Sequence, residues 1–301
     1  MTGFFSVTIE STSYLHISSS QYTTLLKEEN IIELLKKQGF TEEAIHSVAF
    51  EDRYLGFHMT AGLPSIPASS AKGNIRSRIE LSFKAKEGKV RSCFIRATRP
   101  LPPSAVDMRG WRHHRIWGDV VLENRDQACD FTVNRQVCLV CDLFGTNGLQ
   151  GLIRFSDFVG DGVRLERLGL EYGMSVLAAT PNSRFKGSID FLNLKPEEMG
   201  LLFIGMGLRN SARGKDVLLG RFKYRGQMKK YKLGRVVYQL EKLRVSEFSK
   251  PIEIDGISLK PGQTLEGEAL SNLVNILVAN SIHYYEGELD IKDEVLAVEK
   301  L

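Results

Sequence analysis

Residues 63–76, with the sequence LPSIPASSAKGNIR, constrain the fold of this chain more than any other segment. Two prolines stiffen an extended turn, and Ser69 and Ser70, which follow, are natural N-caps of a helix. A helix N-terminus presents unpaired backbone N–H groups and the positive end of the helix dipole, which suit a phosphate. Lys72 and Arg76 lie one turn apart and would add positive charge to the same face. The segment predicts a helix whose start binds a phosphate, with an ordinary capped helix as the alternative.

The basic residues are concentrated in two blocks, which the net charge of +4 conceals. Residues 72–115 contain twelve Lys or Arg against three Asp or Glu, and residues 209–244 contain twelve against two. Residues 245–301 reverse the balance, with four basic and eleven acidic residues. If the fold joins the two basic blocks, they form the electrostatic footprint of a polyanion partner. Solubilising surface charge is the alternative, although such charge usually mixes both signs.

Composition places the chain among globular proteins that bury a sizeable core, since 43% of its 301 residues are hydrophobic. No apolar run approaches the roughly eighteen residues of a membrane helix, and residues 1–7 lack the features of a secretory signal peptide. Four cysteines in a chain of this length argue against a disulfide framework. We therefore expect a cytoplasmic protein without a membrane segment.

Apolar periodicity predicts strands separated by helices. Alternation over residues 4–10 predicts a first strand, and residues 25–38 show the pattern of an amphipathic helix that ends at Gly39. Further strands are predicted at 151–158, 187–194, 218–224 and 233–243, and further helices at 70–83, 195–204 and 268–282. This order, with long irregular insertions, predicts an α+β fold built on one antiparallel sheet.

Cys138 and Cys141 have the spacing of one half of a zinc site. Cys129 with His113 or His114 would complete a closed tetrahedral set of three thiolates and one imidazole. A pair of buried, inert thiols is the alternative.

The same two cysteines open the run CLVCDLFGT at residues 138–146, which is followed by GLIRFSD at 151–157. Together with residues 63–76, these runs resemble the motifs of the RAMP superfamily of CRISPR-associated proteins, and within it the backbone subunits of type III effector complexes. The resemblance spans roughly residues 11–245, and Ala68 stands where the family usually has glycine. It implies a ferredoxin-like, RRM-related antiparallel core over residues 1–245 with an insertion at about 84–144, followed by an acidic extension at 246–301.

The resemblance implies that the protein binds CRISPR RNA and target RNA and assembles with other RAMP subunits. The run GMGLRNSARGK at 205–215 is similar to the glycine-rich loop that the family places against the guide, with a flexible surface loop as the alternative. The runs LGRFKY at 219–224 and LGRVVY at 233–238 both resemble the family's last motif. The predicted RNA-binding residues are His16, Ser69, Ser70, Lys72, Arg76, Arg209, Arg213, Lys215 and Arg221.

The resemblance also implies two metal-dependent features. Glu51 and Asp52 lie where type III backbone subunits carry the acid that cleaves target RNA with Mg²⁺ or Mn²⁺; the alternative is an inactive scaffold with surface charge there. Some relatives carry a structural zinc in the insertion, in agreement with the cysteine spacing. Two other functions stay open: a stand-alone or guide-processing ribonuclease, and an assembly protein that binds an acidic protein partner.

Overall fold

The structure is a computed structural model. It describes residues 1–24, 32–33, 36–37, 39, 41–43, 53–87, 90–93, 128–133, 135–170, 173–225, 227–254 and 256–300. The helix predicted at 25–38 lies largely outside these residues.

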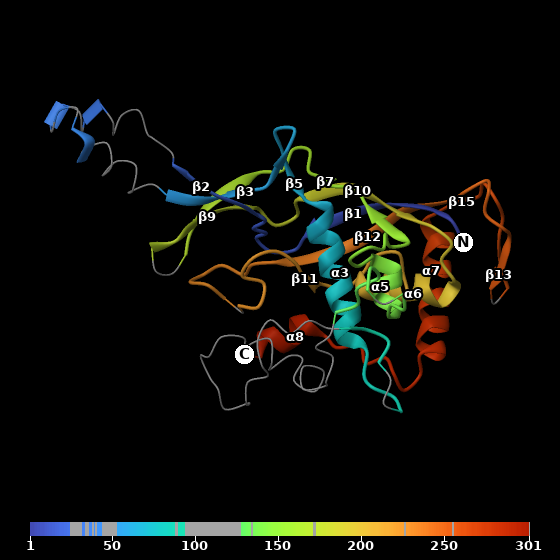
Figure 1. Cartoon of the computed structure of the whole chain (residues 1–301). Helices are drawn as coiled ribbons and strands as arrows, with labels where there is room; N and C mark the ends of the chain where they lie inside the picture. The colour runs from blue at the N-terminus through green and yellow to red at the C-terminus, as the bar shows by residue number, and fades with distance from the viewer. Residues whose placement is uncertain are drawn as a thin grey trace.

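A large antiparallel sheet forms the centre of the molecule (Figure 1). Its strands follow the order β11 (Val217–Leu218), β12 (Arg235–Val245), β1 (Gly3–Ser11), β10 (Arg184–Phe191), β7 (Phe158–Val159), β5 (Leu63–Ile66) and β4 (Met59–Thr60). Two short strands pair beside this path, β15 (Thr264–Glu266) with β12 and β6 (Ile153–Phe155) with β10. The prediction of helices combined with an antiparallel sheet is confirmed.

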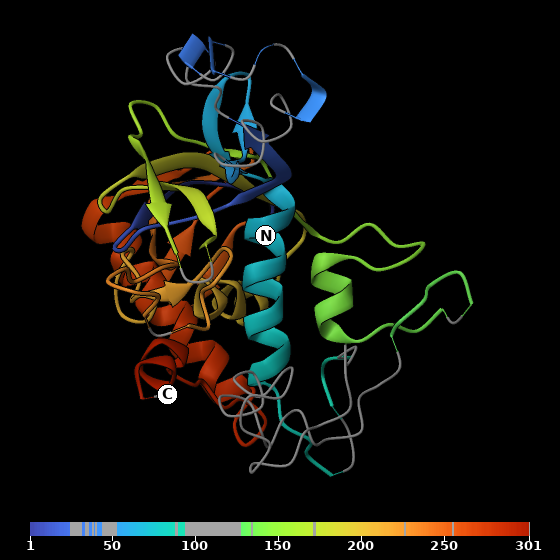
Figure 2. The same cartoon turned by 90° about the vertical axis from the view of Figure 1, so that its left-hand side faces the viewer.

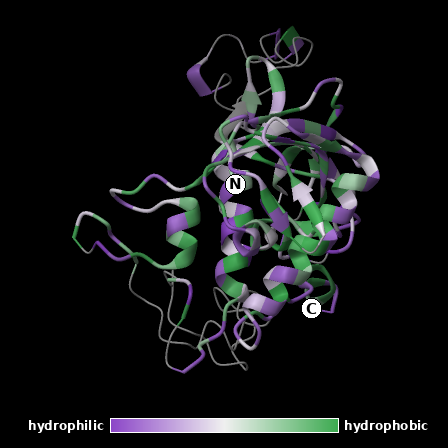
Figure 3. Ribbon diagram, turned by 90° about the vertical axis from the view of Figure 1, so that its right-hand side faces the viewer, coloured by the Kyte–Doolittle hydropathy of each residue, from purple (hydrophilic) through white to green (hydrophobic). Residues whose placement is uncertain are grey.

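Helices α3 (Ala68–Ser82), α6 (Pro196–Gly205) and α7 (Gly267–Tyr284) lie on one face of this sheet (Figure 1). They confirm the helices predicted at 70–83, 195–204 and 268–282. The short helices α5 (Leu139–Phe144) and α8 (Glu294–Glu299) lie beside them. Hydrophobic and hydrophilic bands alternate along the surface helices (Figure 3), as expected for helices that pack one face against a sheet.

The core lies between the central strands and the helical layer. Phe5 of β1 is fully buried, and its ring centroid lies 4.9 Å from that of Phe191 and 5.4 Å from that of Phe203. Helices α3 and α6 approach closely because Gly205 has no side chain: a Cβ there would lie 2.7 Å from the Ile75 side chain. This contact fixes α3 on the helical layer.

A second sheet extends from the large one (Figures 1 and 2). It has the order β2 (Ser18–Thr24), β3 (Arg53–Phe57), β9 (Ser175–Ala179) and β8 (Leu165–Gly169), and only the β3–β9 pair among these is parallel. A small core of its own includes Leu55, Leu168 and Val176. A separate hairpin is formed by β13 (Ile252–Ile254) and β14 (Ile257–Leu259).

Residues 246–301 contribute directly to the core. Strand β15 extends the sheet beside β12, and α7 packs against α6 with Leu273, Val274 and Leu277 buried. Several acids of this segment pair with basic residues elsewhere in the chain. These pairs are Arg78–Glu294, Lys84–Asp290, Arg91–Glu288, Lys232–Glu299 and Lys242–Glu266.

Two strand predictions are only partly correct. The strand expected at 218–224 ends at Leu218, because Gly220 (φ +85°) and Phe222 (φ +66°) adopt left-handed conformations that turn the chain. The strand expected at 151–158 is divided into β6 and the start of β7, with Ser156 and Asp157 between them.

Candidate nucleic-acid interface and metal centre

Helix α3 begins two residues earlier than an N-cap at Ser69 would predict, and three earlier than one at Ser70. Pro67 occupies the N-cap position without a side-chain cap, and the backbone N–H of Ala68 donates to Asp157 Oδ1 over 2.8 Å. The prediction that Ser69 or Ser70 caps the helix is therefore wrong. Asp157 follows β6, and its carboxylate occupies the end of the helix where a phosphate was expected.

The two serines instead line a pocket on the side of α3, with a volume of about 460 Å³. Across the pocket lies the loop that follows β11, which carries Arg221 and Lys223. Two segments predicted separately to bind RNA thus meet here. The full lining is Ile17, Ser18, Ser69, Ser70, Gly73, Asn74, Ser77, Leu219, Gly220, Arg221 and Lys223.

The loop of residues 219–223 depends on glycine. A Cβ at Gly220 would lie 2.7 Å from the His16 carbonyl oxygen, and the same carbonyl accepts the Arg221 N–H over 3.0 Å. Arg221 is exposed, and its guanidinium lies 5.3 Å from the Phe222 ring centroid. Asn74 of α3 holds the base of the loop by donating to the Leu218 carbonyl over 2.6 Å.

Lys223 also lines the pocket, although it is not among the predicted RNA-binding residues. Its ammonium lies 5.1 Å from the Tyr224 ring centroid, and burial lowers the pKa of Lys223. The sequence could have indicated Lys223, because it lies in the run GRFKY, two residues after the predicted RNA-binding residue Arg221.

His16 lies beneath this loop. Its side chain is fully buried, Nδ1 is 2.6 Å from the Leu177 carbonyl oxygen, and the ring stacks on Phe222 with centroids 6.2 Å apart. Burial lowers the pKa of His16, so the imidazole is neutral at pH 7 and Nδ1–H is the donor. This placement supports the loop rather than presenting His16 to a ligand.

Lys72 and Arg76 share a face of α3 as predicted, but that face does not line the pocket. The Arg76 guanidinium donates to three acceptors: Glu80 Oε1 at 2.8 Å, the Gly145 carbonyl at 2.7 Å and Cys141 Sγ at 3.3 Å. Lys72 is half-buried, and burial followed by the charge of Arg76 lowers the pKa of Lys72. Arg76 therefore faces the cysteines, not the pocket.

Two of the three basic residues of the glycine-rich loop, residues 205–215, bond other groups of the same chain. Arg209 donates to the carbonyls of Leu208 (2.7 Å) and Ile204 (3.3 Å) at the end of α6. Arg213 forks onto Glu10 at 3.0 and 3.3 Å, and its hydrogen bond lowers the pKa of Glu10. Lys215 is exposed and lines a different pocket, together with Arg209 and Glu294 of α8. The structure does not bring these three residues to the pocket of Arg221.

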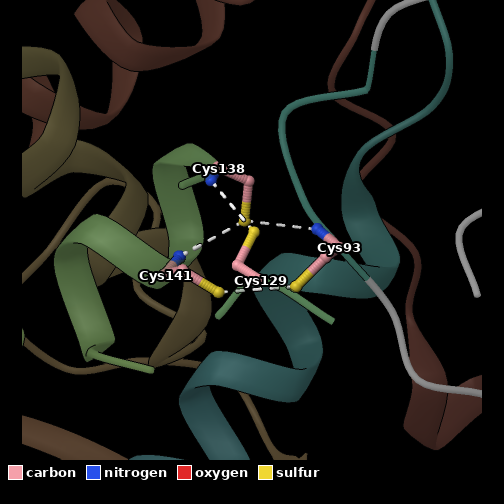
Figure 4. A group of neighbouring side chains, drawn as sticks. All are labelled: Cys93, Cys129, Cys138 and Cys141. Atoms are coloured by element: carbon pink, nitrogen blue, oxygen red, sulfur yellow. Dashed lines mark hydrogen bonds between the residues drawn. The ribbon is translucent and has the colours of Figure 1, made fainter. Parts of the chain in front are cut away.

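Four cysteine side chains point toward a common centre beside α3 (Figure 4). Cys138 is the N-cap of α5 and Cys141 lies in the middle of that helix, while Cys93 follows α3 and Cys129 precedes α5. Their sulfurs all lie within 4.8 Å of one another. The predicted grouping of Cys129, Cys138 and Cys141 is confirmed. The fourth member among the described residues is Cys93, which no local motif marked, while His113 lies outside the described residues.

The spacing of this four-cysteine cluster is compatible with a zinc ion. Zn–S bonds of about 2.3 Å in a tetrahedral site place the sulfurs about 3.8 Å apart. Cys93 Sγ and Cys141 Sγ are 3.4 Å apart, and all four sulfurs lie within 4.8 Å of one another, a range that includes this spacing. Backbone N–H groups already donate to the sulfurs, from Cys93 and Cys141 to Cys138 Sγ and from Cys138 to Cys129 Sγ, at 3.2–3.4 Å. Donors of this kind stabilise thiolates.

The four thiols are close enough for the ionisation of one to oppose the ionisation of another. Hydrogen bonds with Cys138 and Cys141 hold the pKa of Cys93 far below its ordinary value. Hydrogen bonds with Cys138 and Cys93 raise the pKa of Cys141, because a second thiolate would meet the charge of the first. A bound divalent cation would offset this repulsion, since thiols that coordinate a metal are deprotonated.

Glu51 and Asp52, the predicted catalytic acids, lie outside the described residues.

Comparison with protein families gives a match over nearly the whole chain. The family model described as RAMP superfamily matches residues 8–289. The chain belongs to the RAMP superfamily. RAMP proteins are CRISPR-associated, bind CRISPR RNA and act in multi-subunit complexes, so those general features apply to this chain. The match extends beyond residue 245 and includes β13, β14, β15 and the whole of α7.

A comparison with curated proteins finds no match to this RAMP chain. None of the helices in the described ranges combines the length and apolar character needed to cross a bilayer.

Proposed function

We propose that this RAMP protein is a CRISPR RNA-binding backbone subunit of a type III effector complex. The pocket between α3 and residues 219–223 carries the proposal, because it joins two motif segments about 150 residues apart in sequence. Family membership over residues 8–289 supports RNA as the ligand.

The pocket has the chemistry of a phosphate-backbone site. Gly73 and the serine side chains of α3 are small, so a nucleic-acid backbone can approach the helix closely. Arg221 supplies an exposed fork of donors for phosphate oxygens, and Lys223 adds a second positive charge. Binding of this kind depends on phosphate neutralisation and weakens as salt rises.

The order of the central strands supports a ferredoxin-like core. Strand β1 is followed along the chain by α3, by β6 and β7, by β10, by α6 and by β12. In space the order is β12, β1, β10 and then β7, and every pairing is antiparallel. This is the arrangement expected of a βαββαβ unit with both helices on one face.

The four-cysteine cluster would hold a structural zinc through Cys93, Cys129, Cys138 and Cys141. Bound zinc would supply a closed tetrahedral crosslink without an open position for catalysis. Cys93 follows α3 and Cys129 precedes α5, so the crosslink would hold these two cysteines, 36 residues apart in sequence, beside the two helices. Target RNA cleavage with Mg²⁺ or Mn²⁺ is assigned, as part of the same proposal, to Asp52 or Glu51.

The test measures binding of the purified chain to single-stranded guide RNA at several salt concentrations. The double variant Arg221→Gln with Lys223→Gln should weaken binding at least tenfold. The slope of log K against log salt concentration should become shallower by about one to two, which corresponds to the loss of one or two phosphate contacts. Arg213→Gln is the matched control, because it removes an exposed arginine that already pairs with Glu10. Equal affinities in all three proteins would refute the pocket as the RNA site.

A cleavage assay with guide, complementary target and Mg²⁺ or Mn²⁺ completes the test. Metal-dependent cuts that disappear in the Glu51→Ala and Asp52→Ala double variant identify a cleaving subunit. Salt-sensitive binding without cuts in the assembled complex identifies a scaffold. Binding to acidic protein and not to RNA would instead support the assembly-protein alternative.

A further inference from the structure

Arg76 connects the four-cysteine cluster to the helix that lines the RNA pocket. Its side chain is 26% exposed, and its guanidinium hydrogen-bonds Cys141 Sγ, the Gly145 carbonyl and Glu80 at once. Cys141 and Gly145 are the middle and the C-cap of α5. One planar group therefore fixes α5 against α3, which lie side by side in Figures 1 and 2.

The segment that carries these cysteines holds α3 at a second place. Asp157, thirteen residues beyond α5, accepts the hydrogen bond from Ala68 at the start of α3. Both ends of the pocket-lining half of α3 are thus positioned by residues 138–157. Gly73 and Ser77, which line the pocket, lie within one turn of Arg76 on the same rigid helix.

The positive charge of Arg76 would stabilise a metal-bound form of the four-cysteine cluster. Four thiolates around a divalent cation carry a net charge of about −2, and an adjacent guanidinium offsets part of it. Arg76 is the cation that hydrogen-bonds a cluster sulfur among the described residues. Groups that bond a ligand atom from outside the metal shell orient it and strengthen metal binding.

We propose that Arg76 is a positioning residue that couples metal binding at the four-cysteine cluster to RNA binding at α3. The coupling rests on the proposed function, since it needs both zinc at the cysteines and RNA in the pocket. Metal fixes Cys141 and α5, Arg76 transmits that position to α3, and the pocket is held in its binding shape. Because such coupling is reciprocal, RNA raises zinc affinity by the same factor by which zinc raises RNA affinity.

The experiment uses the reduced full-length chain and measures Zn²⁺ affinity by competition with a chromophoric chelator, with and without guide RNA. Arg76→Gln should weaken Zn²⁺ binding by about tenfold, and Arg76→Lys, which keeps the charge but loses the fork, should lie between. Glu80→Gln is the matched control, because it alters another partner of Arg76 and leaves the bond to Cys141 available. Cobalt spectra of each protein report the tetrahedral thiolate site directly.

Guide RNA affinity is measured on the same proteins before and after zinc removal. In the wild type, removal should weaken RNA binding by about fivefold or more, and in Arg76→Gln it should change little. Zinc affinity unchanged by Arg76→Gln, or RNA affinity unchanged by zinc removal, overturns the coupling while zinc and RNA binding stand. A wild type that binds neither Zn²⁺ nor Co²⁺ overturns the zinc proposal, and one that binds zinc but no RNA overturns the RNA proposal.

Discussion

The two halves of α3 differ in the charged residues that they carry and in how these are buried. The first half presents Ser69, Ser70 and Gly73 to an open pocket, and the facing cations come from a distant loop. The second half carries Arg78, which is 6% exposed and bonds Glu294 of α8 over 2.7 Å. Basic residues near a helix therefore do not by themselves locate a nucleic-acid surface. The proposed ligand face lies where small residues leave room, and the buried Arg78 stabilises the fold.

The largest predicted effect is on the second half. Arg78→Ala should lower the free energy of unfolding by about 3–5 kcal/mol, because Glu294 would stay buried without its partner. Urea unfolding followed by circular dichroism measures the change. The double change Arg78→Met with Glu294→Leu is the control, since it removes both charges and should cost much less. A single variant as stable as the wild type would show that the two halves do not differ in this way.

Gly220→Ala tests the loop that faces the first half. The left-handed φ of +85° alone costs an alanine about 1–2 kcal/mol, and the new Cβ would also meet the His16 carbonyl at 2.7 Å. We expect lower stability and weaker RNA binding. Gly162→Ala is the control, because its φ of +69° is similar but its Cβ would meet no atom within 4 Å. Equal stability losses would mean that the contact with His16 carries no energy.

Asp157→Ala tests the start of α3. Loss of this acceptor should cost about 1 kcal/mol, as for other N-cap contacts, and thermal unfolding measures it. Asp161→Ala removes a nearby exposed carboxylate and should change little. If both variants melt together, the helix start does not need its carboxylate.

The smallest effect concerns pH. Burial lowers the pKa of His16 in the folded protein, so folding favours the neutral ring. This contribution to stability is fully present above the unfolded value of about 6.5 and is lost as pH falls through the folded pKa. The wild type should therefore lose more thermal stability between pH 7.5 and pH 5 than His16→Gln does. Parallel losses would contradict the buried, neutral placement.

Local patterns predicted the elements of this fold better than the directions of its side chains. The helices at 70–83, 195–204 and 268–282 follow from periodicity and proline placement, and the CxxC spacing predicted half of the four-cysteine cluster. Arg76 and Cys93 could not be placed in the same way. Their partners are set by tertiary contacts, such as the one between Arg76 and Cys141, 65 residues away. Nothing in the sequence near Cys93 marks it as a ligand.

The number of basic residues in the two basic blocks likewise did not show how many of them stay available to a ligand. Two dense basic blocks predicted a polyanion partner, but part of that charge is neutralised inside the chain by the acidic residues that follow. Periodicity and composition describe each segment separately, whereas ion pairs depend on which segments meet in space. The pocket retains Arg221 as an exposed cation, and this smaller site is what the structure adds to the sequence prediction.

The ion pair of Arg78 with Glu294 also imposes an order on biosynthesis. Glu294 follows Arg78 by 216 residues, so at about 5–20 residues per second a ribosome needs about 10–40 s to supply it. During that interval a nascent α3 has no carboxylate for its inward-facing guanidinium, and burial of its second half is opposed. Helix α3 of each newly made chain therefore completes its packing only after α8 has been synthesised.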